Sequence, residues 1–257
     1  MEFPVKTGAP ASQKTACAIL PVFEGRGLKG PAREVDLSCG GLLSQLLRSG
    51  DASAALGRSL LVPHLQGTAA ERALLVGCGK QADFDAKRVR QVLSTATRRL
   101  RETGLKEATS YLTYTRHRGL DAYYAGRVTV EATRSAYYRF DELKTSSKAK
   151  DKLAKLAIAV ADRRDTKEIR RGVHDGRAIA VGSDLARNLG NRPPNVCTPS
   201  HLAREARALG KRYENIEVTV LGQREMKRLG VGALLSVTQG ADEPPKFIIV
   251  RYRGAGT

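Results

Sequence analysis

Short apolar runs alternate along the chain with longer segments whose apolar residues recur at helical spacing. The segment 85–103 has this spacing, and Gly104 can end the helix that it predicts. A second long helix is expected over 120–140. The apolar runs that predict strands are 15–23, 59–63, 72–77, 109–112 and 156–160. Strands that alternate with helices in this way favour an α/β fold with a substantially parallel sheet.

A third long helix is predicted over 166–189, where apolar residues again recur at helical spacing. Thr166 is a candidate cap at its start, and Gly190 can end it. The dipeptide Pro193-Pro194 then prevents the helix from continuing. A helix at this place can bridge two domains.

The last part of the chain begins with Thr198-Pro199, a hydroxyl cap followed by proline at the first helical position. Beyond that helix, strands are expected at 216–220 and 247–250, with a short helix over 223–229 between them. This part has only ~65 residues, which is small for an independent α/β unit, so we interpret it as interrupted.

The predicted organisation therefore has three parts. They are an N-terminal α/β domain over 1–165, a linker helix over 166–190 and the incomplete start of a second α/β domain over 191–257.

Composition favours a globular chain, because 41% of the residues are hydrophobic and 27% are charged. No apolar run approaches the ~18 residues that cross a bilayer, and the N-terminus lacks the pattern of a secretory signal. We therefore expect a cytoplasmic protein with no membrane partner. The four cysteines have no C-x-x-C spacing and the four histidines are scattered, so neither set predicts a metal site.

Three segments of the later chain resemble the leucyl aminopeptidase (cytosol aminopeptidase) family. Residues 184–199 contain Asn191-Arg192-Pro193-Pro194-Asn195, similar to the family's N-x-P-P-N-x-x-x-P entrance to the catalytic domain. The other two are 225–240, similar to a M-K-x-L-G-M-G stretch, and 244–254, similar to the strand that follows. The front pieces 1–6, 74–80 and 138–144 resemble the bacterial aminopeptidase A branch. The resemblance covers essentially the whole chain.

The resemblance implies an N-terminal α/β (macro-like) domain, a connecting helix and a larger catalytic α/β domain, assembled as a homohexamer. It also implies hydrolysis of peptides next to a free α-amine, with leucine preferred, by two manganese or zinc ions per subunit. Such a metal pair lies about 3.5–4 Å apart and needs several carboxylates at one place.

The family segments that carry the metal ligands and catalytic residues are G-K-G-x-T-F-D-S/T-G-G and N-T-D-A-E-G-R, and neither string occurs in this chain. No catalytic or metal residue can therefore be carried over. We expect an inactive fragment that ends before these motifs, binds no metal and forms no hexamer.

Local motifs do not supply another catalytic site. Asp83 and Asp85 more often start a helix than bind a metal, since acids favour the positive end of a helix. The run Gly77-Cys78-Gly79-Lys80 lacks the G-x-x-x-x-G-K-S/T spacing of a phosphate loop, so a turn at the end of a strand is expected. A structural role is expected for Cys78 as well.

The formal net charge of +18 favours polyanions, although on charge alone a solvated basic surface is the more common explanation. Arginines gathered near one predicted helix could contact phosphates without reading bases. Low aromatic content, 5%, favours duplex backbone over stacked single strands. The candidate nucleic-acid contacts are Arg88, Arg90, Arg98, Arg99, Arg101, Arg116 and Arg118.

Three hypotheses remain open from the sequence. The first is the N-terminal part of a leucyl aminopeptidase, the second is a duplex-DNA-binding module derived from an aminopeptidase A-type protein, and the third is an inert relic or an incomplete gene.

Overall fold

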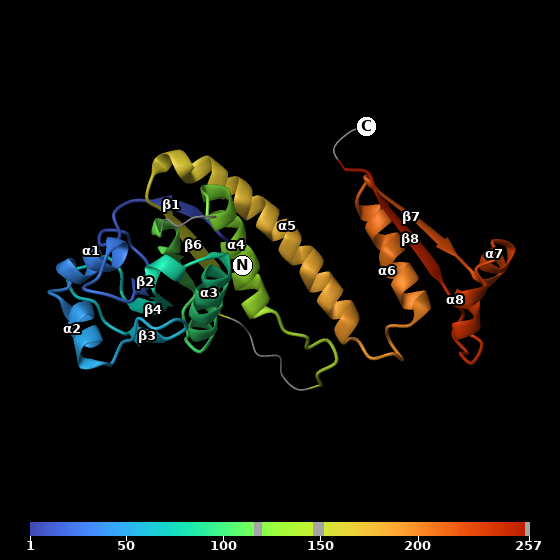
Figure 1. Cartoon of the computed structure of the whole chain (residues 1–257), viewed down its shortest axis with the longest axis horizontal. Coiled ribbons are helices and arrows are strands. Elements are labelled where there is room, and N and C mark those ends of the chain that lie inside the picture. The colour runs from blue at the N-terminus through green and yellow to red at the C-terminus, as the bar shows by residue number, and fades with distance from the viewer. Residues whose placement is uncertain (116–119, 146–151, 255–257) are drawn as a thin grey trace. The chain divides into compact units, whose positions relative to one another are not determined.

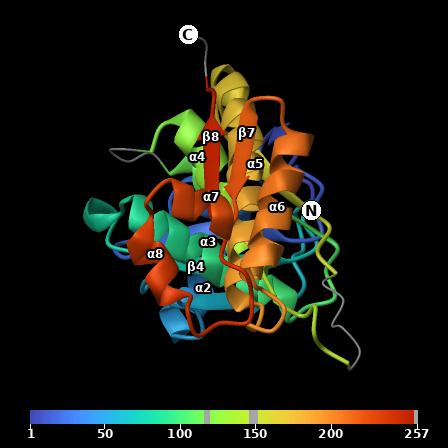
Figure 2. The ribbon, with the colours of Figure 1, turned by 90° about the vertical axis from the view of Figure 1, so that its right-hand side faces the viewer.

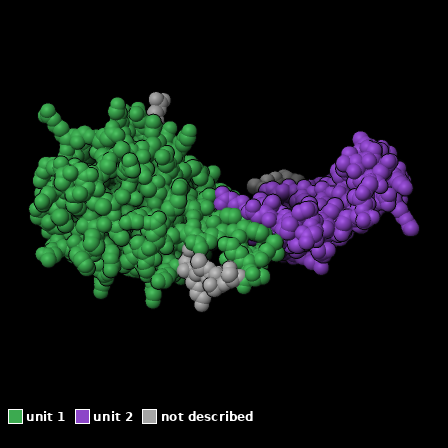
Figure 3. All heavy atoms as spheres, turned by 90° about the horizontal axis from the view of Figure 1, so that it is seen from below, with its two compact units in different colours: residues 1–184 green, residues 185–257 purple. Residues whose placement is uncertain are grey.

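The computed structural model describes residues 1–115, 120–145 and 152–254. The chain divides into two compact units, Met1–Asp184 and Leu185–Thr257, which are coloured separately in Figure 3. No helix among the described residues is long and apolar enough to span a membrane.

A six-stranded sheet forms the centre of the first unit, in the order β1-β6-β5-β2-β4-β3. All neighbouring strands are parallel except β3, which runs antiparallel to β4 at one edge. The strands are β1 (Val5–Thr7), β2 (Ala18–Phe23), β3 (Ser59–Val62), β4 (Ala73–Gly79), β5 (Glu107–Ser110) and β6 (Lys155–Val160). This sheet confirms the α/β fold with a substantially parallel sheet.

Helices cover both faces of the sheet, and this explains why the central strands are apolar on both sides (Figure 1). On one face, Val35 and Leu43 pack against β2 and β4. On the other, Val92, Val128 and Ile169 pack against β2, β4 and β6. The helices are α1 (Gly30–Ser38), α2 (Leu42–Ser49), α3 (Ala86–Arg101), α4 (Ala122–Tyr137) and α5 (Thr166–Asn191).

Aspartates begin two of these helices. The carboxylate of Asp85 accepts a hydrogen bond from the backbone N–H of Arg88, and that of Asp121 accepts one from Tyr124. The expected helix-starting role of Asp85 is confirmed. The predicted helix over 166–189 is also confirmed as α5, although it runs on to Asn191.

Glycines let α4 and α5 approach each other closely. A Cβ atom added to Gly172 of α5 would lie 1.9 Å from the carbonyl oxygen of Tyr123, and one added to Gly126 of α4 would lie 2.3 Å from that of Ile169. A Cβ atom added to Gly176, one turn beyond Gly172, would likewise lie 2.8 Å from the carbonyl oxygen of Arg127. The backbones therefore meet where no larger side chain fits.

The described residues of the second unit form the end of α5, an antiparallel strand pair and three further helices (Figure 2). Its elements are α6 (Pro199–Arg212), β7 (Ile216–Leu221), α7 (Gln223–Arg228), α8 (Gly232–Val237) and β8 (Phe247–Tyr252). The hydroxyl of Thr198 caps α6 by accepting from the backbone N–H of His201, as the Thr-Pro start predicts. The helix α8 was not predicted, since its short apolar run does not differ from a strand by periodicity.

Candidate functional site

Five of the candidate nucleic-acid contacts lie on α3, while Arg116 and Arg118 fall outside the described residues. The guanidinium groups of three of the five donate hydrogen bonds to other groups of the protein. Arg90 donates to Glu131 at 2.6 Å, and Arg99 donates to Glu102 at 2.5 Å. Arg101 donates to the carbonyl oxygen of Ala136 at 2.8 Å.

Arg88 lies 3.9 Å from Asp85, at the limit of an ion pair. Among the described residues, Arg98 alone of the five α3 arginines has neither an ion-pair nor a hydrogen-bond partner for its guanidinium. The helix is thus less available to phosphates than its charge indicates. Duplex binding through these arginines stays a prediction.

Glu131 on α4 joins two of the basic residues. Its carboxylate accepts from Arg90 and from Arg127, each at 2.6 Å, and its side chain is only 11% exposed. Burial alone raises the pKa of this carboxyl, but the two arginine hydrogen bonds outweigh burial and lower the pKa below its ordinary value of 4.5. The group therefore stays ionised and ties α3 to α4.

We expect Glu131→Gln to lower the free energy of unfolding at neutral pH by about 1–2 kcal/mol, because two partly exposed arginines lose their charged acceptor. Since the folded pKa is lowered, this contribution is present above the ordinary pKa of 4.5 and is lost as pH falls through the folded value. Urea unfolding at neutral and acidic pH measures it. In the matched control, Glu102→Gln breaks an exposed pair and costs about 0.5 kcal/mol or less. Equal losses in the two variants would contradict the prediction.

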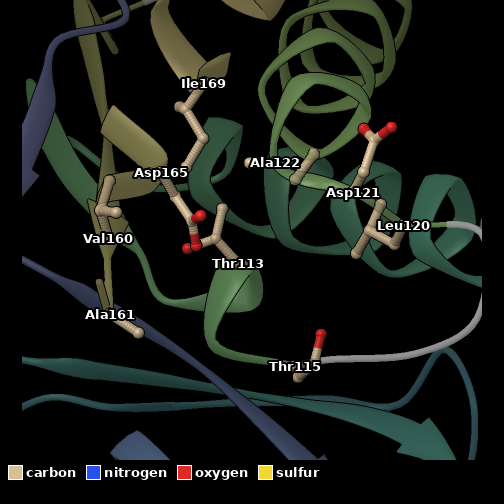
Figure 4. Close-up of a pocket in the computed structure, with 10 residues that line it drawn as sticks. Thr113, Thr115, Leu120, Asp121, Ala122, Val160, Ala161, Asp165 and Ile169 are labelled. Carbon is tan, nitrogen blue, oxygen red and sulfur yellow. The ribbon is translucent and has the colours of Figure 1, made fainter. Parts of the chain in front are cut away.

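A cavity of about 320 Å³ opens at the carboxyl ends of β5 and β6 (Figure 4). Asp121 and Asp165, at the starts of α4 and α5, are the acidic residues that line it among the described residues, together with apolar residues that include Ile169. The hydroxyls of Thr113 and Thr115 also line it, but both already donate to backbone carbonyls within the fold. Among the residues that the structure describes, the lining of this cavity has carboxylates but no cysteine, histidine, lysine or arginine.

Two buried cysteines, Cys78 in β4 and Cys17 directly before β2, are unsuited to nucleophilic chemistry. Burial raises the pKa of the Cys78 thiol to about 12, and burial does the same for Cys17. Both thiols therefore remain protonated at neutral pH. Cys78 lies inside β4, which ends at Gly79, so the expected structural cysteine and strand-ending turn are confirmed.

In the second unit, the segment that resembles the catalytic-domain entrance forms a small polar network. Arg192 Nη1 lies 2.8 Å from His201 Nε2 and 3.6 Å from the carboxylate of Glu205. His201 Nε2 lies 3.6 Å from the same carboxylate. The network joins the end of α5 to α6. The described residues contain no group of three or more His, Cys, Asp or Glu side chains that could hold a metal ion.

The strand β8 exposes apolar side chains on both of its faces. Phe247 and Ile249 are 40% and 38% exposed on one face, and Val250 and Tyr252 are 51% and 67% exposed on the other. The helix α6 packs mainly against β7, where its Gly210 lies beside Val218. Since β7 and β8 form a two-stranded sheet among the described residues, one edge of β8 is open.

Comparison with known families decides which proteins this chain belongs with. The N-terminal domain of the cytosol aminopeptidase family matches residues 19–147, and the catalytic domain of the same family matches residues 184–257. The chain belongs to the cytosol aminopeptidase family. The recognition made on the sequence segments at 184–199, 225–240 and 244–254 is thereby confirmed.

Relatives in this family align with nearly the whole chain. A probable cytosol aminopeptidase of Shewanella piezotolerans is 38% identical over 99% of this chain and 51% of its own length. One from Thioalkalivibrio sulfidiphilus is 39% identical over the same shares. The chain therefore spans about half the length of the curated family members it matches.

Solved structures show the same fold. A mutant of tomato leucine aminopeptidase matches 100% of this chain and 52% of its own chain with a TM-score of 0.84 and 23% identity. The bottromycin maturation enzyme BotP, solved also in complex with Mn, matches 93% of this chain with a TM-score of 0.71. In the cytosol aminopeptidase family, this chain corresponds to the N-terminal domain and the opening of the catalytic domain.

Proposed function

We propose that this chain is the N-terminal part of a metal-dependent leucyl aminopeptidase, a cytoplasmic enzyme that releases N-terminal amino acids from peptides, leucine preferred. Family membership supports the hydrolase, and a neighbour solved with Mn supports a metal cofactor, manganese or zinc. The chain's own described residues do not fit a pair of divalent ions, since no cluster of ligands is present among them. The metal ligands would come from catalytic-domain sequence that this chain does not contain.

The strand β8 carries this proposal. A strand with apolar residues on both faces is typical of the interior of a sheet that is covered on both sides. Here Ile249 and Val250, neighbours on opposite faces, are both exposed. This exposure supports an interior strand whose next neighbour and covering layer would come from further catalytic-domain sequence.

The deciding experiment joins this chain to the half of the Shewanella piezotolerans relative that it does not match, and measures hydrolysis of leucine p-nitroanilide with manganese. Hydrolysis by the joined protein but not by this chain supports the proposal.

The open strand has a consequence for the isolated chain. We expect concentration-dependent self-association, because an exposed edge with apolar faces pairs with other copies. Ile249→Lys is expected to reduce the associated fraction by about half or more, since it places a charge on the exposed face. Gln239→Lys adds the same charge at an exposed position outside the strand pair and serves as the control. Sedimentation velocity that shows a monomer at all concentrations, or equal effects of the two variants, would contradict this expectation.

A further inference from the structure

The loop between β2 and α1 has a glycine spacing that the aminopeptidase assignment does not use. Residues Gly25-Arg26-Gly27-Leu28-Lys29-Gly30 read G-x-G-x-x-G, directly after a strand and at the first residue of a helix. This pattern places backbone N–H groups close to a phosphate in nucleotide-binding proteins. The structure around the three glycines determines whether this loop can bind a phosphate.

The three glycines adopt backbone conformations that other residues rarely adopt, with φ of +126°, +73° and +54° for Gly25, Gly27 and Gly30. A Cβ added to any of them would meet no atom within 4 Å. The loop backbone therefore faces open space and not a packed neighbour. Glycine here lets a ligand approach the main chain closely.

The loop also has unused hydrogen-bond donors. Within the described part of the chain, none of the backbone N–H groups of residues 25–30 donates to a protein acceptor. The helix α1 that follows has no side-chain cap and no acidic residue in its first turn. Consecutive free amides beside an uncapped helix start favour an anion.

A cavity of about 490 Å³ lies against this loop, within the size range of small-molecule sites. It is lined by Gly25 and Gly27 on one side and by Leu47 and Arg48 of α2 on another. The carboxylate-bearing Glu24 lines it too and disfavours an anion. The apolar part of the lining can accept the body of a ligand.

Basic side chains outnumber this single acid at the loop. Arg26 and Lys29 lie within it, and Arg48 lines the cavity. None of the three forms an ion pair with a described residue, in contrast to the paired arginines of α3. Their charge is available to a ligand.

The position in the sheet fits a binding site as well. After β2 the chain passes through α1, α2 and β3 to β4 on one side of β2, whereas β5, on the other side, is followed by β6, farther from β2. Ligands of open α/β sheets bind outside the carboxyl ends of the strands at such a reversal. The loop leaves the carboxyl end of β2, and the residues that line the cavity lie toward β4, where the backbone N–H of Gly79 donates to the carbonyl oxygen of Ala54.

The structure departs from a complete dinucleotide-binding unit, since β3 follows α2 and runs antiparallel to β4. We propose that the loop 25–30 and the adjoining cavity bind the phosphate group of a small organic phosphomonoester. The phosphate accepts hydrogen bonds from the loop amides and faces Arg48, while the remainder of the ligand occupies the cavity beside Leu47. This site is separate from the peptidase chemistry, and its test does not depend on hydrolysis.

Calorimetric titration of the whole chain with AMP, ribose 5-phosphate and adenosine tests the proposal. Both phosphates are expected to bind, and adenosine is expected to bind at least about tenfold more weakly, because it lacks the charged acceptor. Binding of AMP but not ribose 5-phosphate assigns a nucleotide, and the reverse assigns a sugar phosphate. Adenosine binding as tightly as AMP, or no binding of either phosphate, overturns the proposal.

Variants that remove one positive or one negative charge test where the ligand binds. Arg48→Gln is expected to weaken AMP binding about tenfold, whereas Glu24→Gln, which removes the opposing carboxylate, is expected to strengthen it. Arg98→Gln makes the same charge change on α3, which packs on the opposite face of the sheet, and is expected to leave binding unchanged. All three residues are exposed, and ligand-free melting curves check that each variant folds. Equal weakening by Arg48→Gln and Arg98→Gln shows general charge attraction only and overturns the assigned site.

Discussion

Gly172→Ala is expected to destabilise the first unit by about 3 kcal/mol or more, which lowers the melting temperature by roughly 6–12 °C. The added Cβ would lie 1.9 Å from the carbonyl oxygen of Tyr123 and 2.8 Å from the backbone nitrogen of Arg127. Both are main-chain atoms of α4, so no side-chain rotation relieves the overlap. The helices must separate, and the apolar contacts of Ile169 and Val173 are weakened with them.

Gly182→Ala in the same helix is the matched control. Gly182 is exposed, has no positive φ, and an added Cβ would meet nothing within 4 Å. Alanine costs less conformational entropy than glycine in a helix interior, so this change is expected to add about 0.5–1 kcal/mol of stability. Chemical denaturation of the two variants measures the difference. A loss below about 1 kcal/mol for Gly172→Ala would show that the close approach of α4 and α5 is not required.

Leucine p-nitroanilide is expected to remain intact when this chain is mixed with manganese or zinc. Hydrolysis by two metal ions requires several carboxylates around the pair, to generate a hydroxide and to polarise the carbonyl. Among the described residues, Asp121 and Asp165 are the acids that line the cavity at the carboxyl ends of β5 and β6, and Asp121 already caps α4. They do not make such a site.

Joining the chain to the unmatched half of the Shewanella piezotolerans relative is expected to raise hydrolysis at least about a thousandfold above that of the chain alone. The same half joined to an unrelated soluble protein is the control, because it shows what that half does without this chain. Turnover by the isolated chain that persists through successive purification steps would contradict the proposal. A joined protein that folds and binds manganese but does not hydrolyse leucine p-nitroanilide would also contradict the proposal.

The proposed phosphate site could not be predicted from the sequence alone. The G-x-G-x-x-G spacing of residues 25–30 is visible in the sequence, but it was not predicted because no helix was expected at α1. The run 30–38 contains glycine, proline and charged residues and lacks a strong apolar stripe. The context that gives the glycines meaning, a strand before and a helix after, was therefore missing.

The sequence by itself determined the class of fold and most of its elements. Apolar runs identified β2, β4 and β6, helical spacing identified α3 and α5, and the segment around Asn191 identified the family. These features are local, because periodicity, caps and motifs depend on neighbouring residues. The strand predicted at 109–112 was displaced, since β5 runs from Glu107 to Ser110 and Leu112 begins a 3₁₀ turn.

Only the tertiary structure decided how these elements come together. The three-residue strand β1 exists because Val5 pairs with Ile158, a partner that no local pattern indicates. Arg90 forms an ion pair because α4 brings Glu131 to it from 41 residues away. In both cases the deciding contact joins distant parts of the chain, and packing of the sheet and its helices determines which distant residues meet.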